Sequence, residues 1–288
     1  MMCLTLIFTS IATSGQTANT KKTEHISSIG REEFFICTNG CSVNYDNSIE
    51  YYWYNEYSGV KSTIGGNGGS LLNGVYKYFD TKGNLLQERN FKMGVLHGKE
   101  KNWDDKGNIT GESKYENGSA VYFKTKLEDG GWLEFDGPMF ETGSTRKFYT
   151  SFMKLIQVTT WLHFDEVQIK NYYSNGQLEE EYTTSFLFQD NRKGKYNSYY
   201  ENGKPHVIGQ YYDKDFLGLR DGEWKWYKPD GTLESTELYM VDIEYWENGE
   251  YKTLGSRLWS EKHKVFMYTG VWKTYDETGK KIKEMDWR

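Results

Sequence analysis

The chain has 288 residues, of which 17% are aromatic and only 37% hydrophobic, with 30 glycines and 3 prolines. Its net charge is -6, from 41 acidic and 35 basic residues, and neither sign forms a long run. We therefore expect no nucleic-acid partner, because phosphate binding needs a clustered basic face, and no strong membrane binding, because anionic lipid attracts polybasic segments.

The amino terminus carries an apolar stretch followed by small residues. The stretch is too short to span a membrane, and the pattern is typical of a secretory signal peptide. We therefore expect residues 1–15 to be removed on export to the periplasm, the cell surface or the medium. No lysine or arginine precedes the apolar stretch, so the alternative is a buried or disordered amino terminus in a cytoplasmic protein.

Residues 16–72 show no repeat and are expected to form a non-repeat or divergent β head. Removal of the signal would leave two cysteines, Cys37 and Cys41, with Asn39-Gly40 between them. An even number in an exported chain favours a disulfide. Zinc is the alternative, but it needs four ligands, and the five histidines have no paired spacing near these thiols. We therefore predict no metal and no cofactor.

A glycine then recurs at fixed distances from aromatic residues. With the first glycine of each copy at offset zero, a second glycine lies at offset nine, aromatic residues lie at offsets five and seventeen, and glutamate recurs at offset fourteen. The five copies begin at Gly74, Gly98, Gly194, Gly222 and Gly270. A sixth copy has Val167 in place of the first glycine but keeps Asn175-Gly176. Such a period marks a repeat array.

Each copy has the pattern of a β-hairpin. Trp224 and Trp226 alternate with Tyr227, as side chains do along a strand. Lys228-Pro229-Asp230-Gly231 has the residues of a tight turn, and the Asn-Gly pairs elsewhere favour turns as well. We expect the spaced glycines to be bends between stacked aromatic units. The fold class is therefore all-β, an elongated array of antiparallel hairpins, since one hairpin alone is only marginally stable.

The repeat is interrupted between residues 119 and 165. Matching copies occupy residues 73–118 and 166–288, and the interval is rich in aromatic residues, among them Trp132, Phe148 and Trp161. It is interpreted either as degenerate hairpins or as an insertion, and insertions in repeat arrays map to loops that often bind partners.

The repeat Gly-x-Trp-x-x-Tyr, then Asn/Asp-Gly-x-Leu, then Glu and Tyr resembles the bacterial variant of the MORN repeat. The group that it resembles includes YwqK-type antitoxins of toxin–antitoxin pairs. The resemblance implies a curved antiparallel sheet that serves as a binding surface, and it brings no catalytic residue.

Two classes of function remain open. The first is a non-catalytic protein-interaction scaffold, antitoxin-like if the resemblance extends to function. The second is a carbohydrate or cell-envelope binding module, since exposed aromatics stack on sugars. The candidate partner surface consists of the aromatics at offsets two and four, namely Tyr76, Tyr78, Trp224, Trp226 and Trp272. An enzyme is not expected, because no nucleophile lies beside a histidine in the sequence.

Overall fold

The structure is a computed structural model that describes residues 19–138, 140–187 and 191–287. The predicted signal peptide, residues 1–15, lies outside this range. All regular structure in the described residues is β-strand, which confirms the all-β prediction. None of these residues belongs to a helix long and apolar enough to cross a membrane. The chain divides into two compact units, one ending at Val121 and the other beginning at Tyr122, and each is described by itself.

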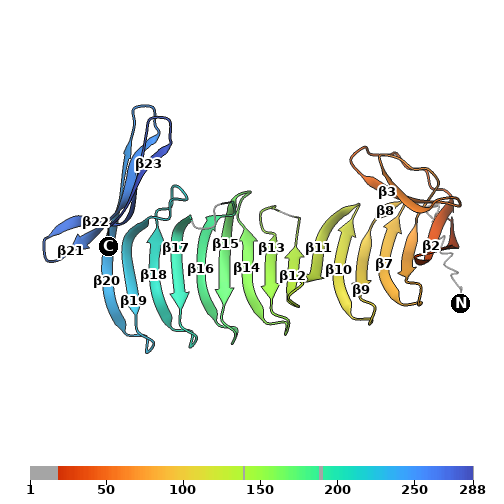
Figure 1. Cartoon of the computed structure of the whole chain (residues 1–288), viewed down its shortest axis with the longest axis horizontal. Coiled ribbons are helices and arrows are strands. Elements are labelled where there is room, and N and C mark those ends of the chain that lie inside the picture. The colour runs from red at the N-terminus through yellow and green to blue at the C-terminus, as the bar shows by residue number, and fades with distance from the viewer. Residues whose placement is uncertain (1–18, 139, 188–190, 288) are drawn as a thin grey trace, which may run out of the picture. The chain divides into compact units, whose positions relative to one another are not determined.

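The first unit contains two antiparallel sheets. Its strands are β1 (Asn19–Ser27), β2 (Gly30–Asn39), β3 (Glu50–Asn55), β4 (Gly59–Ile64), β5 (Ser70–Leu71), β6 (Gly74–Phe79), β7 (Leu85–Lys92), β8 (Val95–Leu96), β9 (Gly98–Trp103) and β10 (Ile109–Glu116). The main sheet pairs β1 with β2, β2 with β6, β6 with β7, β7 with β9 and β9 with β10. Strands β4, β3 and β5 form a small second sheet (Figure 1).

The small sheet covers one face of the first repeat. Its Tyr54 ring lies 4.9 Å from the ring of Phe34, and its Tyr52 ring lies 5.0 Å from that of Phe91. These contacts close a buried cluster formed by Phe34, Ile36, Leu72, Tyr76 and Phe91. The head is therefore built of β-strands and shields the end of the repeat, as terminal caps of repeat arrays do.

The second unit is one antiparallel sheet whose strands pair in chain order. Strand β11 (Ser119–Lys126) begins in the first unit and pairs with β12 from Tyr122 onward. The other strands are β12 (Trp132–Asp136), β13 (Thr145–Tyr149), β14 (Leu155–Trp161), β15 (Glu166–Tyr172), β16 (Leu178–Ser185), β17 (Arg192–Tyr199), β18 (Pro205–Tyr211), β19 (Arg220–Tyr227), β20 (Leu233–Tyr245), β21 (Tyr251–Ser260), β22 (Val265–Tyr275) and β23 (Lys281–Trp287). Strands β12 to β20 lie side by side in a single layer (Figure 1).

Of the two interpretations of residues 119–165, the strand pairing favours hairpins. Strands β11, β12, β13 and β14 pair successively with one another, and β14 pairs onward with β15 of the next repeat. The interval therefore extends the sheet, although its residues have lost the glycine spacing.

The second glycine of each copy lies in a turn, as predicted. Gly231 has a φ of +87°, its amide donates to the Lys228 carbonyl at 2.8 Å, and the Lys228 amide donates to the Thr232 carbonyl at 2.9 Å. This is a type I turn that ends in a left-handed residue, where glycine avoids the clash of a Cβ. The Asn202-Gly203 turn makes the same two backbone bonds. The loop that contains this Asn-Gly pair is therefore longer than a two-residue hairpin turn.

The first glycine lies inside a strand, and not in a bend between units, in the copies that contain Gly194, Gly222 and Gly270, so the prediction is wrong for these copies. Gly222 lies inside β19, at a place where the pairing with β18 shifts. Ile208 faces Lys225 and Gln210 faces Asp221, so a single residue on β18 spans three on β19. The glycine therefore marks a β-bulge, which bends the strand without reversing the chain.

Candidate functional site

Strand alternation gathers many of the large apolar side chains of the second unit on one side of its sheet, which we call the aromatic face. Cross-strand pairing and the two-residue period place one side chain after another on this side. In chain order the side chains on this side include Phe123, Phe135, Arg146, Thr159, Ile169, Tyr182, Tyr196, Val207, Trp224 and Tyr239, of which all but Arg146 and Thr159 are apolar or aromatic. Two buried clusters lie along the face, one around Trp161 and one around Trp224.

The opposite side of each repeat carries paired charges. Lys170 lies 3.4 Å from Glu181 in the second unit, and Lys101 lies 3.3 Å from Glu112 in the first. In three copies, including that of Lys77 and Glu88, the lysine at offset three is thus the partner of the glutamate at offset fourteen, which explains the recurrence of that glutamate in them. Exposed pairs of this kind contribute little stability, and they keep this side of the sheet polar.

The predicted partner surface is only partly exposed. Tyr76 is 8% exposed and Trp224 is 1% exposed, so these two rings are not accessible to a partner. Tyr78 and Trp226 are half-buried. The head covers Tyr76, whose hydroxyl donates to Glu32 at 2.7 Å, and burial followed by this carboxylate raises its pKa. Two of the five rings are therefore closed to stacking on a sugar.

Trp272 is half-buried and lies on the other side of the sheet from Trp224. Tyr239 of the aromatic face pairs with Leu258, so Gly255 points to the opposite side. The Trp272 ring covers Gly255, and its indole nitrogen donates to the Ser256 carbonyl at 3.1 Å. Equivalent repeat positions therefore do not form one surface across the last two copies.

An arginine lies among the aromatic rings at several points of the face. The Arg192 guanidinium lies 4.1 Å from the Tyr182 ring centre and 5.0 Å from that of Tyr196, within cation–π range. Its Nη2 is 3.5 Å from Oε2 of Glu180, which also accepts a 3.1 Å hydrogen bond from the Tyr196 hydroxyl. Burial, followed by the negative charge of Glu180, raises the pKa of Tyr196.

A second such group surrounds Arg220. Its guanidinium lies 4.6 Å from the Trp224 ring centre and donates to the Tyr239 hydroxyl at 2.8 Å. That hydroxyl donates in turn to Glu237 at 2.7 Å. Burial, followed by the bond to Glu237, raises the pKa of Tyr239. Arginine, tyrosine and glutamate thus form a closed polar group within an apolar surface.

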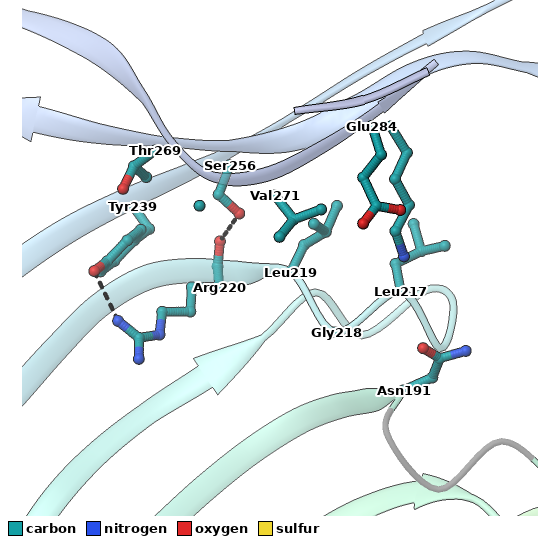
Figure 2. A pocket seen from close by; sticks show the side chains of 12 residues that line it. Asn191, Leu217, Gly218, Leu219, Arg220, Tyr239, Ser256, Thr269, Val271 and Glu284 are labelled. Atoms are coloured by element: carbon teal, nitrogen blue, oxygen red, sulfur yellow. Dashed lines mark hydrogen bonds between the residues drawn. The ribbon is translucent and has the colours of Figure 1, made fainter. Parts of the chain in front are cut away.

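A pocket of about 650 Å³ opens beside Arg220, where the last strands turn over the sheet (Figure 2). Its lining combines apolar side chains, hydroxyls and charges of both signs: Leu217, Leu219, Val271, Tyr239, Ser256, Thr269, Arg220, Lys273 and Glu284. The Ser256 hydroxyl donates to the Arg220 carbonyl at 2.9 Å. Such a lining fits a small polar group. No sequence spacing marks it, because its residues come from strands far apart in the chain.

The remaining predicted site is in the head. Cys37 and Cys41 form a disulfide, with their Cα atoms 6.1 Å apart. In the described part of the chain, no three histidine, cysteine, aspartate or glutamate side chains are grouped so that they could hold a metal ion.

The fold and its repeats define an antiparallel β-repeat protein, and six of its segments match the family model described as MORN repeat variant. These segments are residues 72–93, 96–117, 166–185, 192–213, 220–240 and 268–288. Each contains one of the six copies found in the sequence, so the identification of the repeats is confirmed. The interval 119–165 lies outside the matches.

No curated protein matches the chain. Among solved structures it is similar to a pore of the Photorhabdus luminescens Tc holotoxin, with 12% identity and a TM-score of 0.14. That alignment covers 91% of this chain and 18% of the other, so the chain spans less than a fifth of the toxin chain's length. So low a TM-score carries no argument about fold or function.

Proposed function

We propose that this protein is a non-catalytic scaffold that holds a partner protein on the aromatic face of its second unit. The observation that carries the proposal is the set of side chains on that face, where buried and half-buried aromatic rings alternate with arginines. Tyrosine, tryptophan and arginine are the residues that dominate the energetics of protein interfaces. The opposite side carries paired lysines and glutamates, which are depleted from interface cores.

A capture experiment with paired variants tests the proposal. The full chain is used as bait in extracts of the native organism, and a captured protein is then purified for direct binding measurements. We expect Trp226→Ala, on the aromatic face, to weaken binding at least about tenfold, as loss of an interface hot spot does. The matched control is the double change Lys170→Ala and Glu181→Ala on the opposite side, which leaves the net charge unchanged and is expected to bind normally.

Equal binding by the two variants would contradict the proposal, and so would a bait that retains only glycan. The second outcome would favour the carbohydrate-binding alternative. Trp226 is the suitable position, because it is half-buried whereas Trp224 is enclosed by the core.

The compartment separates two finer versions of the proposal. An exported scaffold is supported by the apolar amino-terminal segment and by the Cys37–Cys41 disulfide, since disulfides persist in oxidising compartments. An antitoxin-like scaffold is supported by the likeness of the repeats to YwqK-type chains, and such pairs act inside the cell. Fractionation of native cells, followed by detection of the chain, distinguishes the two, and a toxin is the first partner class to test if the chain is cytoplasmic.

A further inference from the structure

Arg146 differs from the other arginines of the described residues in having neither an acidic partner nor a hydrogen bond from its guanidinium within those residues. Arg89 is paired with Glu100, Arg192 with Glu180 and Arg257 with Asp242, while Arg31 contacts Glu33. Arg220 reaches Glu237 through the Tyr239 hydroxyl. By contrast, no carboxylate pairs with Arg146 in the described part of the chain, and its Nε is buried without a hydrogen-bond acceptor there.

The surroundings of Arg146 are apolar. Its guanidinium lies 5.0 Å from the ring centre of Phe148, 5.4 Å from that of Phe186 and 5.7 Å from that of Trp161. The side chain is half-buried, and loss of solvent lowers the pKa of the guanidinium, with no neighbouring negative charge to oppose the effect. Cation–π contacts offset part of the cost of burying the charge, but they satisfy no hydrogen-bond donor.

Two further polar atoms at this place also lack partners within the described residues. They are the indole Nε1 of Trp161, a residue that is 1% exposed, and the hydroxyl Oγ1 of Thr159, a residue that is 0% exposed. Thr159 is the cross-strand partner of Arg146. Buried polar atoms are rarely left unpaired in folded proteins, so the Nε of Arg146 and these two neighbouring atoms mark a region whose polar contacts are incomplete.

The rim of this region is exposed and apolar. Phe140 is 41% exposed and packs against Trp161 and Phe186 at ring distances of 5.8 Å and 5.6 Å. Leu187, next to Phe186, is 63% exposed. An arginine surrounded by aromatic rings, with an apolar rim that excludes water, is the arrangement found at the centre of protein interfaces.

We propose that Arg146 is the anchor for a carboxylate side chain of the partner protein, an aspartate or glutamate that lies beside apolar residues. This inference rests on the proposed scaffold function and specifies the chemistry of its partner. A planar guanidinium can donate two parallel hydrogen bonds to a carboxylate, and such bonds are strong where water is excluded. A nucleic acid would need several cations in a row, whereas Lys147, the adjacent cation, points to the other side and pairs with Glu134 at 3.0 Å.

The test uses peptides as the probe. A library of random peptides displayed on phage is selected against the full-length wild-type chain, and separately against Arg146→Met and Arg192→Met. We expect peptides from the wild-type selection to share an aspartate or glutamate next to an apolar residue. That preference should disappear with Arg146→Met and persist with Arg192→Met, because the guanidinium of Arg192 is already paired with Glu180.

A double-mutant cycle then identifies the pair. Replacing the acidic residue of a selected peptide by its amide should reduce affinity for the wild-type chain about tenfold or more, and should change little for Arg146→Met. Arg146→Lys keeps the charge without the planar fork, and we expect it to retain only part of the preference. If Arg146→Met does not fold, the Lys variant alone carries the comparison.

The outcomes separate this inference from the proposed function. Selected peptides without an acidic residue, or an acidic preference that Arg146→Met and Arg146→Lys both retain in full, would overturn the role of Arg146 and leave the scaffold proposal standing. Enrichment of no peptide at all would count against both. Thermal melting adds an independent readout, since Arg192→Met should lower the melting temperature by removing the cation that faces Glu180, whereas Arg146→Met should not lower it.

Discussion

The indole ring of Trp224 lies directly over the backbone of Gly209 on the neighbouring strand. A Cβ atom on Gly209 would lie only 2.2 Å from the Cδ2 atom of Trp224. The ring is held in place by a 3.0 Å hydrogen bond from its Nε1 to the Gln210 carbonyl. Trp272 and Gly255 repeat the arrangement, since a Cβ atom on Gly255 would lie only 2.3 Å from the Cδ2 atom of Trp272. At these two places, therefore, a glycine on the neighbouring strand makes room for a tryptophan ring.

The first prediction concerns this contact. Gly209→Ala should displace the Trp224 ring from the centre of its buried cluster and destabilise the second unit by about 1–3 kcal/mol, as overpacking of a core does. Thermal denaturation monitored by tryptophan fluorescence measures the effect. The control is Gly66→Ala, where the added Cβ meets no atom within 4 Å. Equal melting temperatures for the two variants would show that the ring is not fixed over Gly209.

The second prediction concerns the turn at Gly231. Because its φ is +87°, Gly231→Val places a β-branched side chain in the left-handed region, and we expect a loss of about 1–3 kcal/mol. Glu234→Val introduces the same side chain at an exposed strand position and should have a much smaller effect. Chemical denaturation of both variants provides the comparison, and a smaller loss for Gly231→Val would contradict the turn assignment.

The third prediction concerns a ladder of hydrogen bonds between successive turns. The Asn202 amide donates to the Pro229 carbonyl at 2.8 Å, and Asn175 and Asn248 make the same contact to Glu201 at 2.9 Å and to Glu277 at 2.6 Å. Asn202→Asp keeps the acceptor used within its own turn but removes the donor. We expect a loss of about 1 kcal/mol and faster amide exchange at the Pro229 turn. Glu201→Gln, a neighbouring exposed change, should leave both quantities unaltered.

The fourth prediction concerns acid. Hydrogen bonds from Thr232 hold the pKa of Asp230 below its usual value of 3.8, and Asp276 is held low in the same way by Thr278. A carboxyl whose pKa is lower in the folded state stabilises that state above its unfolded pKa, and the contribution is lost as pH falls through the folded pKa. Melting temperatures should therefore fall as the pH drops below about 4. Asp230→Asn should reduce that fall, and an unchanged acid dependence would contradict a role for this turn.

Local features of the fold could be predicted from the sequence, because each repeat has its own turn and strand pattern. The spacing of Gly222, Gly231 and Tyr239 is sufficient to predict a hairpin. Packing between strands could not be predicted in this way. The burial of Tyr76 depends on a head that lacks the repeat, and the side on which Trp272 lies depends on side-chain alternation along β21, between Leu258 and Gly255. The spacing of glycines does not distinguish a bulge from a turn.

The candidate site was harder to predict for the same reason. Arg146 and Thr159 are adjacent only through strand pairing, and the interval that contains them has no repeat to guide an alignment. A sequence signal did exist, since aromatic residues concentrate there, but their number does not reveal which charge lies among them unpaired. The lysine at offset three was a missed signal. It recurs as Lys77, Lys101 and Lys170, and each of these lysines pairs with the glutamate at offset fourteen of its own copy.

The central claim is that the partner lies on the aromatic face, and site-specific photo-crosslinking measures this directly. A photoreactive phenylalanine analogue replaces Trp226 in one variant and Lys225 in another, two adjacent positions on opposite sides of β19. After irradiation in native cells, we predict a crosslinked protein from position 226 and none from position 225. Crosslinks from position 225 alone, or equal crosslinks from both, would contradict the assignment of the binding face.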